Sequence, residues 1–127
     1  MAFDKAKALE AAQKYAAKGS VDKAIKELLH VVAADPNDVR VWLQLGDLYA
    51  KKGTKREAMD AYLRVAQSYE AQGFFLKAVA VYKQTVEIDA KRVDVIVKLA
   101  ELHHKLGLTS DAVRYEDLAA RLQGTSR

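Results

Sequence analysis

The side chains that could bind a metal ion or catalyse a reaction are few and widely spaced in this sequence. The three histidines are His30, His103 and His104, and Glu101 stands three residues before His104, which is weak support for a metal site. The absence of cysteine excludes disulfides, thiolate metal ligands and a cysteine nucleophile. No phosphate-binding glycine loop or nucleophile motif accompanies these residues. We therefore expect no catalytic, cofactor or metal site, and a protein that is not an enzyme.

Four carboxylates are more suggestive, because helical spacing places them on one predicted surface without a lysine or arginine among them. They are Asp60, Glu70, Asp94 and Glu101. A surface of this charge would prefer a basic or polar segment of a partner. The alternative is an ordinary solvated surface, in which Asp60 pairs with Arg64 at the favourable i, i+4 spacing.

The elements that must position these side chains are helices that end at regularly placed glycines. Asp4, Ser20, Asp38 and Thr54 are candidate N-caps, and apolar residues follow them at helical spacing. The turn glycines stand at 19, 53, 73 and 107, so the intervals between them are 34, 20 and 34. The short middle interval leaves room for one helix only. We therefore expect seven helices, with the helix at 55–72 used both as the second helix of one hairpin and as the first helix of the next.

The helical hairpin expected at 39–72 carries a specific pattern. Trp42-x-x-Leu45-Gly46-x-x-Tyr49 is followed by Ala58-x-x-x-Tyr62, and a weaker match stands one repeat earlier. This pattern resembles the tetratricopeptide repeat (TPR) family, in a bacterial-type scaffold domain. The resemblance implies an all-α fold, a right-handed superhelix of antiparallel helices in a single domain, 1–127. The expected repeats are 5–38, 39–72, 59–92 and 93–124, with a tail at 124–127.

The resemblance also implies that the chain is a protein-interaction scaffold that holds a peptide or protein surface against its concave helix faces. On the first helix of each repeat, the side opposite the core predicts two short binding surfaces. The first predicted surface contains Leu9, Gln13, Arg40, Leu43 and Asp47. The second predicted surface contains the four carboxylates with Leu63, Gln67, Val97 and His104. Phe74, next to a turn glycine, is a possible apolar anchor for a partner or for self-association.

The charge and hydropathy of the sequence limit which kinds of partner and which compartment we expect. The formal net charge of +4 is divided evenly, because residues 1–72 and residues 73–127 each carry two more basic than acidic side chains. A nucleic-acid binder usually concentrates its positive charge, so a nucleic-acid-associated array is the less favoured alternative. The other alternative is a self-assembling module that uses its terminal helices or Phe74. The sequence has no signal-peptide core and no membrane-spanning run, so we expect a cytoplasmic protein with a protein or peptide partner and no membrane insertion.

Overall fold

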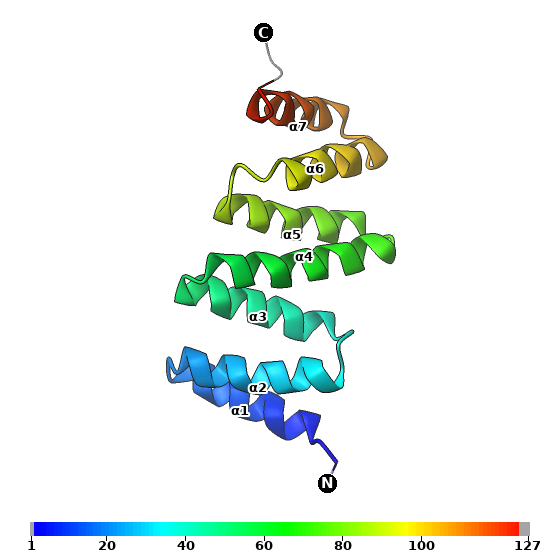
Figure 1. Ribbon diagram of the computed structural model, residues 1–127. Helices are drawn as coiled ribbons and strands as arrows, with labels where there is room; N and C mark the ends of the chain where they lie inside the picture. The colour runs from blue at the N-terminus through cyan, green and yellow to red at the C-terminus, as the bar shows by residue number, and fades with distance from the viewer. Residues whose placement is uncertain (1, 125–127) are drawn as a thin grey trace. The chain divides into compact units, whose positions relative to one another are not determined.

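The computed structural model describes residues 2–124, and over this part of the chain it contains seven α-helices and no strand (Figure 1). The helices are α1 (Lys5–Ala17), α2 (Val21–Ala34), α3 (Val39–Lys52), α4 (Lys55–Ala71), α5 (Phe75–Ile88), α6 (Val93–Lys105) and α7 (Thr109–Leu122). The predicted all-α class with seven helices is confirmed. The helix predicted at 55–72 is α4, an uninterrupted helix of 17 residues. Of the predicted tail, residues 125–127 lie outside the described residues.

Glycines end four of the helices as their spacing predicted. Gly19, Gly53, Gly73 and Gly107 all have positive φ, from 76° to 90°. Side chains with a Cβ atom are strained in this conformation, so glycine is the residue best suited to these turns. The unequal intervals between these glycines therefore correspond to unequal intervals between the turns.

The helix starts follow the predictions less closely. The Asp4 carboxylate accepts a hydrogen bond from the Lys7 backbone N–H at 3.1 Å, as an N-cap should. Ser20 makes no side-chain cap hydrogen bond, and the Thr54 hydroxyl donates to the Tyr49 carbonyl oxygen at 3.1 Å instead. The predicted capping role of these two hydroxyls is therefore wrong. The Thr54 hydroxyl joins the backbone N–H groups of Gly53 and Thr54 on one carbonyl at the end of α3, and this contact competes with the capping of α4.

The chain divides into two compact units, residues 1–64 and residues 65–127, and the division lies inside α4. In the first unit α1 packs on α2 and α2 packs on α3. The buried core of this unit consists of Ala8, Ala12, Ile25, Leu28, Val31, Val32, Val41, Leu45 and Ala61. Gly46 in α3 lies directly against the ring of Tyr62 in α4, and the absent side chain of the glycine leaves room for that ring.

In the second unit α5 packs on α6 and α6 packs on α7. Its fully or almost fully buried side chains include Val65, Ala66, Ala78, Val95, Ile96, Leu99, Leu102 and Ala112. His103 is buried with them, and its Nδ1 lies 2.7 Å from the Leu99 carbonyl oxygen. The His103 ring also contacts the ring of Tyr115, with the two centroids 5.0 Å apart. This histidine is therefore a packed core residue.

Within residues 2–124, no helix is long and apolar enough to cross a membrane. The same residues contain no buried side-chain nitrogen or oxygen without a hydrogen-bond partner. The polar groups inside the two units are thus compensated, as stable burial requires.

Candidate functional site

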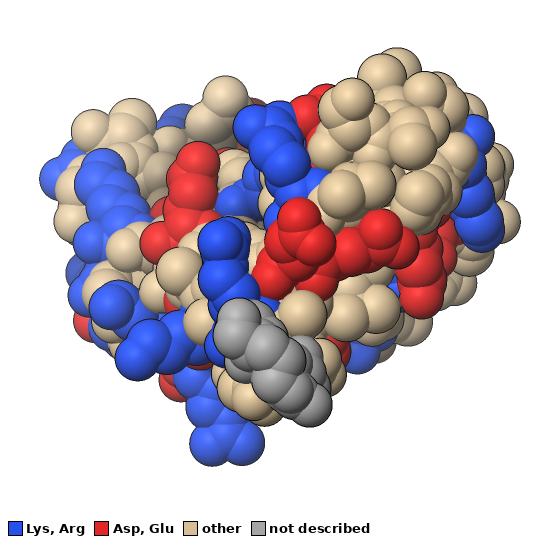
Figure 2. All heavy atoms as spheres, turned by 90° about the horizontal axis from the view of Figure 1, so that it is seen from above, with Lys and Arg blue, Asp and Glu red and all other residues tan. Residues whose placement is uncertain are grey.

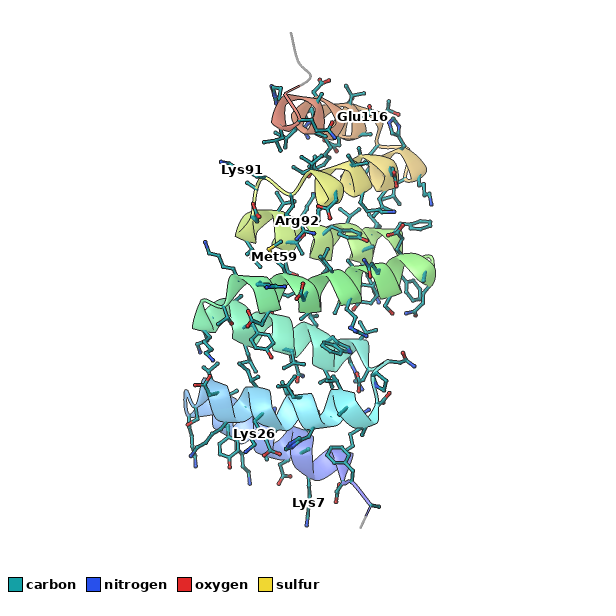
Figure 3. The ribbon with its side chains drawn as sticks, viewed as in Figure 1. Lys7, Lys26, Met59, Lys91, Arg92 and Glu116 are labelled. Carbon is teal, nitrogen blue, oxygen red and sulfur yellow. The ribbon has the colours of Figure 1, made fainter. Side chains whose placement is uncertain are left out.

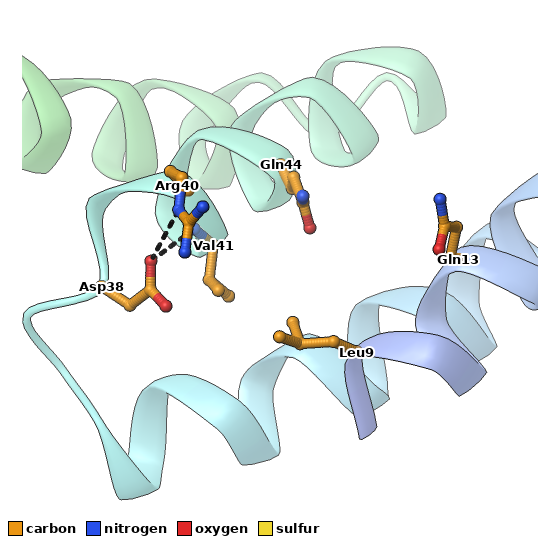
Figure 4. A pocket seen from close by; sticks show the side chains of 6 residues that line it. All are labelled: Leu9, Gln13, Asp38, Arg40, Val41 and Gln44. Carbon is orange, nitrogen blue, oxygen red and sulfur yellow. Dashed lines mark hydrogen bonds and ion pairs between the residues drawn. The ribbon is translucent and has the colours of Figure 1, made fainter. Parts of the chain in front are cut away.

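The first unit has a pocket between α1 and α3 of about 280 Å³ (Figure 4). Its lining brings together three residues of the first predicted surface, Leu9 and Gln13 from α1 and Arg40 from α3. Asp38, Val41 and Gln44 complete the lining. In Figure 4 the amides of Gln13 and Gln44 project from the two helices at the same side of the pocket, and Leu9 forms its floor near Val41.

A second pocket of about 190 Å³ adjoins the first and is mostly apolar. It is lined by Ala12, Ala16, Leu28, Gln44, Asp47 and Leu48. Gln44 lines both pockets, so they adjoin at this residue, and we name the two pockets together the first-unit groove and define it by these two sets of residues. Asp47 of the first predicted surface belongs to this groove, whereas Leu43 lines neither pocket.

The charges at one end of the first-unit groove are partly neutralised. The Lys5 ammonium lies 2.7 Å from the Asp38 carboxylate and 2.8 Å from that of Asp35. The hydrogen bond from Lys5, together with the one from the Val41 backbone N–H, holds the pKa of Asp38 below its usual value. Arg40 lies 4.0 Å from Asp38 and its side chain is 87% exposed, so the guanidinium is available to a ligand.

At the other end of the groove, a carboxylate is held in place by a tyrosine. The Tyr62 hydroxyl donates a hydrogen bond of 2.5 Å to Asp47, which is otherwise exposed. A phenol donor fixes the carboxylate without cancelling its charge. The first-unit groove therefore has a positive end at Arg40, two amides at its middle and a negative end at Asp47.

The second predicted surface is only partly acidic in the structure. Glu70 accepts a hydrogen bond from the Tyr82 hydroxyl at 2.9 Å and forms an ion pair with Lys98 at 3.1 Å. Lys98 also lies 3.3 Å from Glu101. Asp94 is held by two hydrogen bonds from Arg92, of 2.9 and 2.7 Å. The expectation of carboxylates without a basic partner is wrong for Glu70, Asp94 and Glu101, because the long side chains of Lys98 and Arg92 reach them from neighbouring positions.

These contacts shift the pKa values of Lys98, Asp94 and Tyr82. The hydrogen bond to Glu70 raises the pKa of Lys98 above its usual value. The hydrogen bonds from Arg92 hold the pKa of Asp94 below its usual value. Burial, and then the hydrogen bond to Glu70, raise the pKa of the Tyr82 phenol. All three groups therefore keep one protonation state near neutral pH.

The remaining residues of the second predicted surface belong to both units. Asp60 and Leu63 belong to the first unit, whereas Gln67 and Val97 are exposed in the second. The His104 ring nitrogen Nε2 lies 3.2 Å from the carboxylate of Glu116, which is on α7 (Figure 3). Among residues 2–124 no three potential ligands lie close enough together to hold a metal ion.

Arg64 does not form the expected pair with Asp60. Its guanidinium lies over the Trp42 ring, 4.4 Å from the centroid, and the Trp42 indole N–H donates to the Pro36 carbonyl oxygen at 2.8 Å. Flat guanidinium groups stack well on indole rings, and Arg64 makes this contact in place of the ion pair. Figure 2 shows both basic and acidic side chains on the face turned toward the viewer.

Two family models match the sequence. The model described as TPR repeat matches residues 12–53, and the model described as tetratricopeptide repeat matches residues 39–68. A comparison with curated proteins finds no match.

Similar solved structures include several of the protein MamA. One crystal structure of MamA is 20% identical in sequence, with a TM-score of 0.51 over 98% of this chain and 77% of the MamA chain. A structure of a MamA variant is 21% identical, with a TM-score of 0.52 over 94% of this chain and 98% of the MamA chain. At this identity the similarity shows the fold and carries no information on the partner.

Proposed function

Because this chain is a tetratricopeptide-repeat protein, a member of a family of protein-interaction scaffolds, we propose that it binds an extended peptide segment of a partner protein in the first-unit groove. The observation that carries the proposal is the pair of adjoining pockets between α1 and α3, which combine an apolar floor with two amides. The proposed role involves no catalysis and no cofactor. We also propose that residues 1–127 form one domain with the repeats at 5–38, 39–72, 59–92 and 93–124, and that it works in the cytoplasm.

The two amides in the groove suit a peptide backbone. Each glutamine side chain offers two N–H donors and one carbonyl acceptor, so Gln13 and Gln44 can both satisfy peptide groups that lose water on binding. The small pocket formed by Ala12, Ala16, Leu28 and Leu48 can take one apolar side chain of the peptide. An apolar pocket beside a few polar groups is the usual composition of a specific ligand site.

The charged ends of the groove suggest the order of residues in the peptide. Arg40 and Asp47 are seven positions apart on α3, which is about 10 Å along the helix axis. An extended peptide covers that distance in about three residues. The small apolar pocket lies at the Asp47 end. We therefore propose a ligand with an acidic residue near Arg40, then a spacer, then an apolar residue followed by a basic residue near Asp47.

A binding surface is less strongly supported in the second unit. Glu70, Asp94 and Glu101 face two basic side chains, Lys98 and Arg92, so this surface carries one net negative charge. We propose that it accepts a polar or weakly basic segment of the same partner. Leu43, Leu63, Gln67, Val97 and His104 remain predicted contacts at the edges of the two surfaces.

The proposal for the first-unit groove is tested with short labelled peptides and fluorescence anisotropy. The peptides place Asp-Ala-Leu-Lys, in either chain direction, within a neutral Gly/Ser context, and the control peptide exchanges Ala and Leu. We expect the control peptide to bind more weakly, because it moves the apolar side chain away from its pocket.

Variants of the protein complete the test. Gln13→Ala with Gln44→Ala should weaken binding roughly tenfold through the loss of hydrogen bonds to the peptide. The matched control Gln123→Ala removes an exposed amide at the end of α7 and should leave affinity unchanged. Equal affinity for both peptides, or equal affinity of the groove variant and the control, would contradict the proposal.

A further inference from the structure

The first residue after each turn glycine differs between the two units. In the first unit these residues are Ser20 and Thr54, and in the second unit they are Phe74 and Leu108. Phe74 and Leu108 occupy the N-cap positions of α5 and α7 and make no side-chain cap hydrogen bond. Large apolar residues are among the least favourable at this position. Helix formation therefore does not account for them.

Core packing does not account for Phe74 and Leu108 either. The Phe74 side chain is 47% exposed and that of Leu108 is 42% exposed. Leu76, in the first turn of α5, is 69% exposed. Single exposed apolar residues are common on protein surfaces, but here three of them stand at two turns of one unit.

These two turns lie at the same edge of the second unit. The Lys105 ammonium at the end of α6 lies 5.1 Å from the centroid of the Phe75 ring at the start of α5, which joins the two turns directly. In Figure 1 both turns, α4 to α5 and α6 to α7, stand on the same side. We name this region the turn edge and define it as Phe74, Leu76, Lys77, Lys105 and Leu108.

The turn edge is positively charged. Lys77 lies 5.1 Å from the Phe74 centroid and 5.7 Å from that of Tyr69. Among residues 2–124, neither Lys77 nor Lys105 forms an ion pair with a carboxylate. The nearby acidic groups are already engaged, since Asp111 pairs with Arg114 and Glu116 with His104. Two cations thus remain over aromatic rings beside exposed apolar side chains.

We propose that the turn edge docks an acidic segment of a partner protein whose apolar side chains cover Phe74 and Leu108. Charge complementarity selects this occupant, because Lys77 and Lys105 lack carboxylate partners and would gain them from the segment. Aromatic side chains flanked by cations are typical anchors of protein interfaces. This surface is separate from the first-unit groove and does not depend on the function proposed for it.

Two other occupants fit the charges less well. A second copy of this chain carries a formal net charge of +4, which opposes docking on a positive edge. An anionic membrane surface attracts clusters of about four to eight basic residues, and the turn edge offers two. Both occupants are included as outcomes of the test.

The first variant gives the second unit the residues that the first unit has at the same positions. Phe74→Ser with Leu108→Thr removes the apolar side chains, and the melting temperature should change little because both residues are exposed. The second variant, Lys77→Gln with Lys105→Gln, removes the charges. The matched control, Lys7→Gln with Lys26→Gln, removes two lysines of the first unit, which Figure 3 shows on α1 and α2.

The probe is an immobilised synthetic peptide that alternates Leu and Glu, and its counterpart alternates Leu and Lys. We expect the Leu/Glu peptide to bind the native chain and the Leu/Lys peptide to bind far more weakly. Each turn-edge variant should bind the Leu/Glu peptide roughly tenfold more weakly than the native chain, and the control should bind it as the native chain does. The charge variant should also lose part of the salt dependence of binding.

Four results would overturn the proposal. The first is equal binding of the Leu/Glu peptide by the native chain and both turn-edge variants, and the second is no binding by any of them. The third is binding to anionic phospholipid vesicles that is lost in Phe74→Ser with Leu108→Thr, without binding of the peptide, which would assign the turn edge to a membrane. The fourth is a concentration-dependent dimer in sedimentation that the same variant abolishes, which would assign it to a second copy.

Discussion

Replacing Gly46 by alanine should destabilise the first unit, although alanine is the better helix former. A Cβ atom added at Gly46 would lie 2.6 and 2.7 Å from two carbons of the Tyr62 ring. The ring cannot easily move away, because Tyr62 is 4% exposed and its hydroxyl donates to Asp47. The substitution therefore increases helix propensity, which stabilises the unit, but introduces a steric clash, which destabilises it.

The magnitudes favour destabilisation. Alanine in place of glycine stabilises a helix interior by about 1 kcal/mol. Overpacking of a buried site costs about 1–3 kcal/mol, and loss of a hydrogen bond to a charged acceptor costs about 1.5 kcal/mol. We expect a net loss of about 2 kcal/mol in the free energy of unfolding, or roughly 8 °C in melting temperature.

The second unit indicates how this loss can be rescued. At the positions that correspond to Gly46 and Tyr62 it has Ala66 and Tyr82, and Tyr82 donates to Glu70 instead. Residue 50 corresponds to Glu70 but is alanine. Adding Ala50→Glu to Gly46→Ala offers the displaced Tyr62 hydroxyl a new acceptor and should restore about half of the loss, or about 1 kcal/mol.

Urea unfolding followed by the fluorescence of Trp42, the one tryptophan, measures both effects in the first unit. The single change Ala50→Glu is the control for the added charge, and we expect it to alter stability little because residue 50 is exposed. An increase in stability of about 1 kcal/mol in Gly46→Ala would mean that helix propensity outweighs the clash, and would refute this reasoning.

Three further predictions concern other contacts. Tyr82→Phe should cost about 1 kcal/mol in urea unfolding, because Glu70 loses one hydrogen bond; no change would show that the bond adds nothing to stability. The lowered pKa of Asp38 means that its contribution is complete above about pH 4 and is lost as the pH falls through the folded-state value, so Asp38→Asn should flatten the pH dependence of the melting temperature in that acid range. An unaltered acid profile would contradict this. Ala66→Pro should cost about 3 kcal/mol or more and reduce hydrogen-exchange protection in both units, since α4 supplies both cores; loss in one unit only would contradict the shared use of α4.

The turns and helices could be predicted from the sequence because each depends on a local preference. Glycines with positive φ end the helices at the predicted positions, and the unequal intervals between them predict the number of helices. Ser20 and Thr54 were predicted less well. The Thr54 hydroxyl bonds the end of the preceding helix instead of the start of the new one, and the sequence does not distinguish these two partners.

The candidate surfaces could be predicted only approximately. The predicted first surface included Leu43, but Gln44 is the residue that lines both pockets of the groove. Successive residues are about 100° apart around a helix, so a rotation of α3 by about half of that angle decides which of the two neighbours faces the groove. The predicted acidic surface is only partly acidic for another reason. Lys98 is long enough to reach Glu70 and Glu101, and a pattern of positions contains no information on how far a side chain extends.

Two hydrogen bonds of the same kind support the predicted dual use of α4. In the first unit α4 supplies the tyrosine, since Tyr62 donates to Asp47 on α3. In the second unit α4 supplies the carboxylate, since Tyr82 on α5 donates to Glu70. The tyrosine comes from the second helix of a hairpin in both cases and the acceptor from the first. The helix thus changes its role between Tyr62 and Glu70, and the division between the units falls between these two residues. A single uninterrupted helix is therefore enough to end one hairpin and begin the next, which explains the short interval between Gly53 and Gly73.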